Sequence, residues 1–280
     1  MVIPRQKFDN NMYNFLVDSH CHLDLIEESG ISFEDIIKNS KNNNIKILQT
    51  ICTRISNINK IIKYTEKEQS VYCSIGTHPC NVSNEEFYSC EQIKQICEDN
   101  MKIIGIGETG LDYFHDKSTK NLQKKYFLEH INVSRETKLP TIIHSRDADK
   151  DMIDILKIEQ NNGEFPALLH CFSSSYELAK NALDLGVFIS ISGIVTFKNA
   201  TDLQKMVRDI PLDMLLIETD SPYLSPTPYR GKINQPAYLV NVADFIANIK
   251  NISIEKVINH TTANFFNLFK KVANDTAKIS

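Results

Sequence analysis

The stretch Phe15-Leu16-Val17-Asp18-Ser19-His20-Cys21-His22 lies near the start of the chain and gives the first indication of its architecture. The apolar residues at its start predict a short β-strand, and residues two positions apart on a strand project to the same side. His20 and His22 therefore point the same way and lie close together, whereas Cys21 is expected to face away from them into the next layer. Such a His-x-His pair occurs in metal sites, but two polar residues at a strand end are as often only solvated. The rest of the chain decides between these interpretations.

Short apolar runs like this one recur along the chain and predict eight strands, at 15–17, 45–49, 71–74, 102–106, 141–143, 167–169, 187–190 and 215–217. Amphipathic segments with helical spacing, such as 121–137 and 149–160, lie between them. Nearly continuous apolar strands separated by helical crossovers indicate a parallel sheet. Eight such units in about 250 residues favour a closed (β/α)8 barrel, the TIM barrel, over an open doubly wound sheet.

The domain organisation is expected to be simple, because no Pro/Gly/Ser-rich linker divides the chain. We predict an N-terminal extension at 1–14, a single barrel domain at 15–272 and a flexible tail at 273–280. Two helices, at 237–249 and 254–269, are expected to close the outer layer, and Ser253 is a plausible N-cap of the second. Phe265, Phe266 and Phe269 have the spacing of a helix face that packs into the core.

The composition excludes several classes of protein. The net charge of −4 argues against a broad basic surface that coats nucleic acid, because counterion release needs several clustered Lys or Arg, although a local, metal-assisted phosphate site remains possible. Seven cysteines without a Cys-x-x-Cys pair indicate neither a disulfide framework nor a zinc ribbon, so a cytoplasmic location is expected. No stretch approaches the ~18 apolar residues of a membrane helix. We expect no membrane association and no obligate protein partner.

Potential metal ligands follow five of the predicted strands, and they are His20, His22, Glu108, His144, His170 and Asp220. In a barrel of this kind the C-terminal ends of the strands converge on one face, where the catalytic groups lie. Each residue alone could equally cap a neighbouring helix, but six at equivalent places indicate a metal centre.

Four histidines and two carboxylates are enough for two ions, with Glu108 as the bridge and with ligands that suit Zn²⁺, Mn²⁺ or a similar divalent ion. Two ions about 3.5 to 4 Å apart can hold a hydroxide nucleophile and polarise a phosphoryl or carbonyl oxygen. Asp220, with one oxygen free of the metal, could orient the attacking water and accept its proton. The residues therefore predict a hydrolase that uses a two-metal mechanism with a metal-bound water.

The sequence around these ligands resembles the TatD family of metal-dependent deoxyribonucleases from about residue 18 to residue 269. The matching motifs are DSHCHL at 18–23, GETGLDY at 107–113, LPTIIHSRDA at 139–148, HCFS at 170–173, SGIVTFKN at 192–199, ETDSPYL at 218–224 and YRGK at 229–232. The resemblance implies a barrel of the metallo-dependent hydrolase type with two divalent ions per chain, Mg²⁺, Mn²⁺ or Zn²⁺. It also implies hydrolysis of DNA phosphodiester bonds, often as a 3′-to-5′ exonuclease, with single-stranded DNA ends as the partner.

The resemblance also implies a division of labour among the site residues. One ion would be held by His20, His22, Glu108 and Asp220, and the second by Glu108, His144 and His170. His78, in the motif GTHP at 76–79, resembles a family histidine near the substrate phosphate, so the catalytic set would be Asp220, Glu108 and His78. Where many relatives carry a second histidine after this proline, the chain has Cys80, which we expect to be inert.

Other residues are candidates for substrate contacts. Arg146 and Arg230, the latter with Lys232 close by, offer a planar fork or a charge to phosphate, and an ion pair with Asp147 is the competing interpretation for Arg146. Tyr113 could stack on a base or serve only in loop packing. The remaining histidines, expected to have structural roles because no partner is spaced near them, are His115, His130 and His260.

Three alternatives share part of this pattern. An amidohydrolase of the phosphotriesterase or dihydroorotase kind has the same barrel and His-x-His pair, but such enzymes commonly bridge their ions with a modified lysine, whereas Glu108 occupies the matching strand end here. A D-aminoacyl-tRNA deacylase would use the same ions on an ester. A metal-binding interaction protein without turnover is disfavoured because the full ligand set is present.

Overall fold

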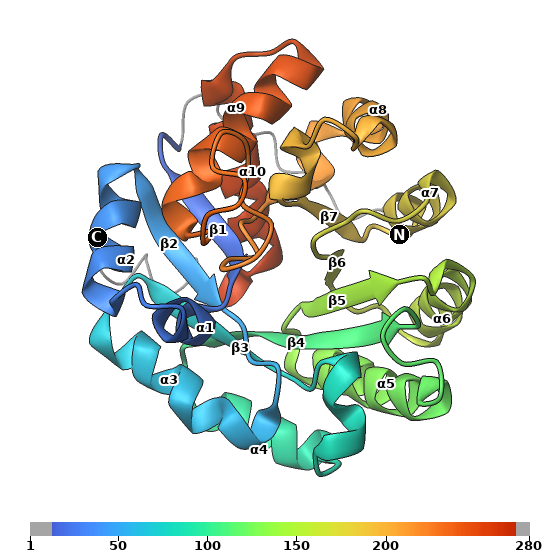
Figure 1. The fold of residues 1–280 in the computed structure, drawn as a ribbon. Helices are drawn as coiled ribbons and strands as arrows, with labels where there is room; N and C mark the ends of the chain where they lie inside the picture. Colours follow the sequence, from blue (N-terminus) through green and yellow to red (C-terminus); the bar gives the residue numbers. More distant parts are fainter. Residues whose placement is uncertain (1–12, 273–280) are drawn as a thin grey trace.

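The computed structural model describes residues 13–272, so most of the expected extension and the whole of the expected tail lie outside the described residues. Eight parallel strands form one sheet in which each strand pairs with the next along the chain. The strands are β1 (Leu16–Cys21), β2 (Ile45–Thr50), β3 (Val71–Ile75), β4 (Ile103–Asp112), β5 (Thr141–Arg146), β6 (Ala167–Leu169), β7 (Phe188–Ile191) and β8 (Leu215–Ile217). A parallel bridge between Cys21 and Ser221 brings the segment after β8 to β1. The predicted TIM barrel is confirmed, and Figure 1 shows its strands around a common centre.

Ten α-helices lie in the described part of the chain, mostly outside the strands (Figure 1). They are α1 (Leu23–Glu28), α2 (Phe33–Asn42), α3 (Ile58–Lys67), α4 (Cys90–Asp99), α5 (Lys120–Thr137), α6 (Asp149–Asn162), α7 (Tyr176–Asp184), α8 (Thr201–Asp209), α9 (Leu239–Lys250) and α10 (Ile254–Leu268). Short 3-10 turns complete the layer at η1 (Ile55–Asn57), η2 (Pro79–Asn84), η3 (Gly193–Thr196), η4 (Leu212–Met214) and η5 (Pro236–Tyr238). Ser253 caps α10 as predicted, because its side chain accepts a hydrogen bond from the Lys256 amide. Among the described residues, no helix has the length and apolar character needed to cross a membrane.

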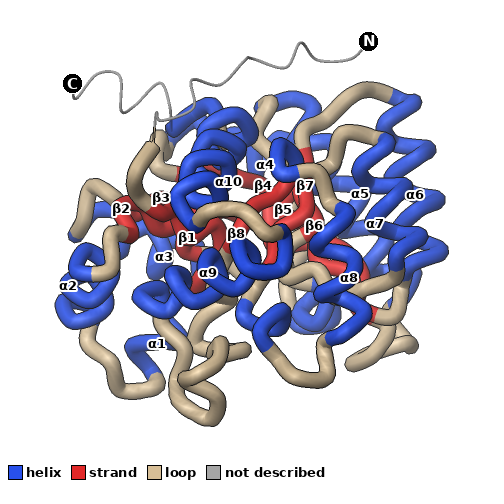
Figure 2. The backbone as a smooth tube through the Cα atoms, turned by 90° about the horizontal axis from the view of Figure 1, so that it is seen from above, coloured by secondary structure: helices blue, strands red, loops and turns tan. Residues whose placement is uncertain are grey.

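The interior of the barrel is an apolar layer to which most strands contribute one side chain. Phe265 and Phe269 of α10 pack against this layer, and a Cβ atom on Gly105 would lie 3.3 Å from the Phe269 ring. The strand residues of the layer are Val17, Ile47, Tyr72, Ile104, Ile142, Leu168 and Leu216. Figure 2 shows α10 beside β1 and β8. The Thr262 hydroxyl on α10 also bonds the carbonyl of Phe15, just before β1, so α10 covers the end of the barrel at which the strands begin.

Three strands are longer than their apolar runs predict. β1, β4 and β5 continue through polar residues at the opposite end of the barrel, so His20, Glu108 and His144 lie within strands rather than just after them. The reason is that the parallel ladder depends on backbone groups, which continue to pair where the side chains are polar.

Two of these strands carry an irregularity at the ligand-bearing residue. Between Ile106 and Thr109, β4 advances three residues while β5 advances two, and β1 does the same relative to β2 between Asp18 and Cys21. An extra residue of this kind bends the strand and redirects a side chain. Gly107 makes the bend in β4 possible, since its φ is +141° and a Cβ atom there would lie 2.5 Å from the Ile142 carbonyl oxygen. The two bulges thus set the directions of His20 and Glu108.

Candidate metal centre

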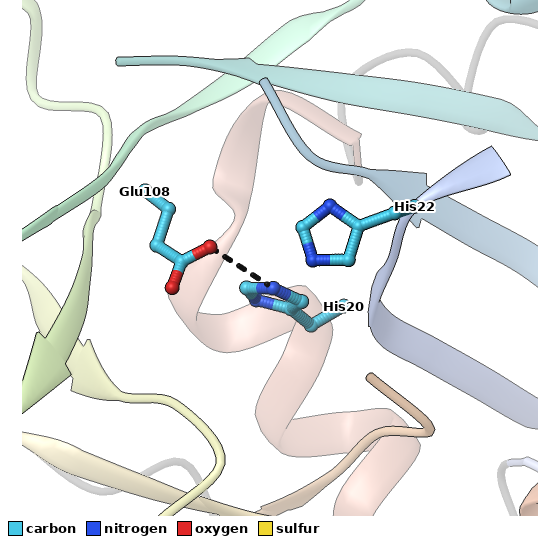
Figure 3. Close-up of side chains that lie close together, drawn as sticks. All are labelled: His20, His22 and Glu108. Carbon is cyan, nitrogen blue, oxygen red and sulfur yellow. Dashed lines mark ion pairs between the residues drawn. The ribbon is translucent and has the colours of Figure 1, made fainter. Parts of the chain in front are cut away.

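The C-terminal mouth of the barrel brings together all six candidate ligands. His20 lies on β1, Glu108 on β4 and His144 on β5, while His22 directly precedes α1. The other two, His170 and Asp220, follow β6 and β8. Figure 3 shows three of them: Glu108 of β4 points toward His20 of β1, and His22 lies beside His20.

Glu108 lies at the centre of the group, and its two carboxylate oxygens face different histidines. Oε1 lies 2.7 Å from His170 Nε2, 3.0 Å from His144 Nδ1 and 3.3 Å from His78 Nε2. Oε2 lies 3.5 Å from His20 Nε2. Each oxygen of Glu108 therefore lies beside a different set of imidazoles.

Asp220 approaches the group from the segment after β8. Its Oδ1 lies 3.4 Å from His22 Nε2 and 3.6 Å from His20 Nε2. The Asp220 amide donates a hydrogen bond to the His20 carbonyl oxygen at 2.9 Å. The backbone of β1 therefore positions both the histidine pair and the carboxylate opposite it.

The burial of these side chains provides a test of whether they suit a metal. Both ring nitrogens of His20, and Nδ1 of His22, are buried without a hydrogen-bond partner. A buried polar atom without a partner is costly, and an imidazole nitrogen is a good ligand for a divalent ion. The donor set thus fits one or more metal ions at this place.

Around Glu108 and His20, the described residues form three overlapping groups whose ligand atoms are close enough to share an ion. These are His20 with His22 and Glu108, His20 with His170 and Asp220, and His78 with Glu108 and His144. His78, expected near the substrate phosphate, therefore also lies within the range of a ligand. The expected division of the residues between two ions remains a prediction.

The electrostatics of the group favour ionised carboxylates. Burial by itself would raise the pKa of Glu108, but His170, His78 and His144 hold that pKa well below its usual range. Burial would likewise raise the pKa of Asp220, which His22 and His20 lower instead. Both side chains therefore carry negative charge at neutral pH.

The histidines do not titrate alike. Burial and the neighbouring His170 lower the pKa of His20, whose ring stacks on that of His170 at 3.9 Å between centroids. Burial would lower the pKa of His170 too, but Glu108 and Glu218 raise it well above the ordinary value. His20 is consequently neutral, as a metal ligand must be.

Two carboxylates behind the site were missed by the sequence reasoning. Asp112 Oδ2 lies 3.1 Å from His144 Nε2, and Glu218 Oε1 lies 3.2 Å from His170 Nδ1. Histidines that bind metals commonly donate their other ring N–H to a carboxylate, which fixes the tautomer and the orientation of the ring. Their positions in the sequence could have indicated them. Asp112 lies in the motif of Glu108, and Glu218 lies in the motif of Asp220.

The interpretation of Tyr113 as a stacking platform is wrong. Its ring is only 4% exposed, and its hydroxyl donates to Asp151 Oδ2 at 2.6 Å, so no ring face is open to a base. The next residue, Phe114, is 57% exposed, and the guanidinium of Arg146 lies 3.9 Å from its ring centroid. The exposed aromatic surface at the end of β4 therefore belongs to Phe114.

The two candidate arginines differ in their surroundings. Arg146 is exposed and borders a hollow lined by Ser145, Asp149 and residues 173–175. Arg230 packs against the Phe197 ring at 3.6 Å and donates to the Ser225 carbonyl oxygen, contacts that tie it to its own loop and to the neighbouring turn. Lys232 Nζ lies 5.6 Å from the Tyr229 ring in the same loop.

Two of the residues with expected structural roles, Cys21 and His130, have contacts that fit such roles. As predicted, Cys21 faces away from the site, donating through Sγ to the Gln49 carbonyl oxygen. His130 is buried and accepts from the Thr77 amide through Nε2, which is a structural role. His260 lies on α10.

His115 does not fit the expectation. Its Nδ1 lies 2.8 Å from Asp112 Oδ2, and Cys80 Sγ lies 3.6 Å from the same oxygen. The expectation that His115 has no partner is therefore wrong, because the partners come from a strand and from a turn that sequence spacing does not connect.

Comparisons with known proteins identify the family to which this chain is similar and confirm its fold. Residues 17–270 match the family model described as TatD related DNase. The metal-dependent hydrolase BU355 of Buchnera aphidicola is 46% identical over 264 residues, covering 91% of this chain and 99% of that protein. The metal-dependent hydrolase YcfH of Escherichia coli is 39% identical, covering 91% of this chain and 96% of that protein. The solved structure of the TatD homologue YjjV from Escherichia coli shares the fold, with a TM-score of 0.81 at 24% identity, covering 91% of this chain and 98% of that one.

Proposed function

Because this chain belongs to the TatD family of metal-dependent hydrolases, we propose that it is a deoxyribonuclease that hydrolyses DNA phosphodiester bonds in the cytoplasm. The proposed mode is 3′-to-5′ exonuclease action on single-stranded ends, with two divalent ions, Mg²⁺, Mn²⁺ or Zn²⁺. The family model is described as TatD related DNase, which supports this choice of substrate.

The observation that carries the proposal is the position of Glu108. Its Oε1 is within 3.3 Å of three imidazoles and its Oε2 faces His20 at 3.5 Å. A carboxylate between two histidine groups suits two neighbouring cations, and two-ion sites of this kind serve phosphodiester hydrolysis.

Divalent ions held at this mouth would supply Lewis acidity toward a phosphoryl oxygen and would lower the pKa of a water molecule there. The residues of the chain perform the remaining tasks. Asp220, ionised and next to His22, is positioned to orient the attacking water and accept its proton. His78, half-buried beside Glu108 and His144, can donate a hydrogen bond to a phosphate oxygen.

Substrate binding is assigned to the rim of the mouth. Arg146 offers a guanidinium fork to the backbone phosphate, and the exposed ring of Phe114 beneath it offers a face on which a terminal base can stack. Such contacts tolerate any base, which suits a nuclease without sequence preference.

The alternative substrates use the same groups. A D-aminoacyl-tRNA ester or an amide or phosphotriester bond would also place its reacting oxygen beside Glu108 and Asp220. The choice of DNA rests on the family description and on the aromatic and cationic rim. A protein without turnover is disfavoured because the full set of candidate ligands converges at this mouth.

The test is an assay of purified protein with Mg²⁺, Mn²⁺ or Zn²⁺ added separately. The substrates are DNA labelled at its 5′ end, single- and double-stranded, beside D-aminoacyl-tRNA and simple ester substrates, with Asp220→Asn as the inactive control. We expect a ladder of shortened single strands that still carry the 5′ label. Intact DNA with every ion, together with turnover of another substrate, would overturn the proposal.

A further inference from the structure

Three residues beside the candidate metal centre form a second group of potential ligands. Cys80 lies in the turn η2 after β3, Asp112 is the last residue of β4, and His115 lies in the loop before α5. Asp112 Oδ2 is 2.8 Å from His115 Nδ1 and 3.6 Å from Cys80 Sγ, and all three ligand atoms lie within 4.8 Å of one another.

These separations suit a tetrahedral ion. Zinc bonds of about 2.0 Å to nitrogen or oxygen and about 2.3 Å to sulfur place tetrahedral ligand atoms about 3.3 to 3.6 Å apart. The 3.6 Å between Asp112 Oδ2 and Cys80 Sγ lies at the upper end of this range, and the 2.8 Å between Asp112 Oδ2 and His115 Nδ1 is shorter than it. Three ligands leave a fourth position open to water.

The position of Asp112 also favours a cation. Its Oδ1 accepts hydrogen bonds from the amides of Phe114 and His115, so the loop fixes the carboxylate. Its Oδ2 then faces Cys80, His115 and His144 together. A fully buried carboxylate oxygen surrounded by an imidazole and a thiol on one side is well placed for a divalent ion.

The chemistry of the group differs from that of the main centre. None of the three ligand groups at the main centre contains a cysteine among the described residues, whereas this one combines sulfur, nitrogen and oxygen. Thiolate and imidazole together favour Zn²⁺ over Mg²⁺ or Mn²⁺.

We propose that Cys80, Asp112 and His115 form an additional cation site that takes Zn²⁺ or a similar thiophilic divalent ion. The ion reaches the site from solvent, because Cys80 and His115 are exposed. Its binding displaces the thiol proton of Cys80. Asp112 Oδ2 also contacts His144 Nε2. An ion bound to this oxygen would therefore affect the orientation of the His144 ring.

The experiment is a titration of the full-length protein with Co²⁺, followed by the near-ultraviolet charge-transfer absorption that a thiolate-bound Co²⁺ ion produces. This readout does not depend on hydrolysis, so failure of the site and failure of the proposed function can be told apart. We expect the absorption in the parent and in Cys90→Ser and Cys171→Ser, which are matched cysteine controls. We expect it to be absent from Cys80→Ser and Cys80→His.

Bound zinc gives an independent measurement. After dialysis against a zinc buffer, Cys80→Ser and His115→Ala should each hold one ion per chain fewer than the parent, while Cys80→His should recover that ion. Circular dichroism and the unfolding temperature show that each variant is folded. Charge-transfer absorption that persists in Cys80→Ser, or a zinc content equal to that of the parent in both Cys80→Ser and His115→Ala, would overturn the proposal.

Discussion

The carboxylate of Asp112 lies 3.1 Å from Nε2 of His144, and Nδ1 of the same ring faces Glu108 at 3.0 Å. This contact fixes which nitrogen of His144 is free to bind an ion. Removing the carboxylate in Asp112→Ala should raise the Mn²⁺ concentration for half-maximal hydrolysis about 10- to 100-fold. Mn²⁺ is the appropriate ion because it prefers oxygen and nitrogen ligands to thiolate. Asp112→Asn retains an acceptor and should have a smaller effect, so equal losses in the two variants would argue against this positioning role.

Replacement of Asp220 tests the proposed base. Asp220→Asn keeps the shape of the side chain but removes its charge, and turnover should fall by about 10²- to 10⁴-fold. The fold should remain intact, because the backbone hydrogen bond from the amide of residue 220 to the His20 carbonyl oxygen does not depend on the side chain. Activity close to that of the parent would remove Asp220 from the mechanism.

The bulge on β4 can be tested through its glycine. Gly107→Ala places a methyl group against the Ile142 carbonyl at positive φ, whereas Gly186 has a φ of +76° with nothing within 4 Å of an added Cβ atom. Gly186→Ala should cost about 1 to 2 kcal/mol of stability from the backbone conformation alone. Gly107→Ala should cost clearly more, as measured by chemical denaturation. Similar costs for the two variants would mean that β4 can shift to make room.

The stability of the fold should depend on the protonation of His130. Burial lowers the pKa of this histidine to about 4, whereas an unfolded chain titrates near pH ~6.5. The unfolded state therefore binds more protons between these values, so the contribution of His130 is fully present above pH ~6.5 and is lost as the pH falls toward 4. The free energy of unfolding should fall by about 2 kcal/mol more in the parent than in His130→Gln between about pH 7.5 and pH 5. Identical pH profiles would contradict the shift.

The exposed ring of Phe114 should matter for polymer substrates only. Stacking of a base is worth about 1 to 3 kcal/mol, so Phe114→Ala should raise KM for single-stranded DNA about 5- to 150-fold and leave hydrolysis of a small phosphodiester unchanged. Tyr113→Phe is the matched control and should alter neither, since its hydroxyl contacts Asp151. An equal loss in both variants would indicate damage to the loop instead.

The barrel could be predicted from the sequence because each strand contains an apolar run that repeats after a helical segment. The length of β1, β4 and β5 could not, since polar residues such as His20 and His144 resemble loop residues although their backbones remain paired. The candidate ligands were found for the same reason that the barrel was, namely that they follow apolar runs.

Contacts between side chains from different strands and loops could not be predicted from the sequence. The partnership of Cys80 and His115 with Asp112 depends on how a turn and a loop fold over the end of β4. Which of Tyr113 and Phe114 faces solvent depends on the backbone just after that strand, so the sequence could not decide between base stacking and loop packing for Tyr113.

The packing of α10 against the start of the strands closes the N-terminal end of the barrel. Phe265 and Phe269 close that end with apolar side chains. A substrate can therefore reach Glu108, and a product can leave it, only through the C-terminal mouth of the barrel. A DNA strand cannot be threaded through such a molecule. Under the proposed function each released nucleotide must leave past the strand that still occupies the entrance, so departure of the product and advance of the strand compete for the same space.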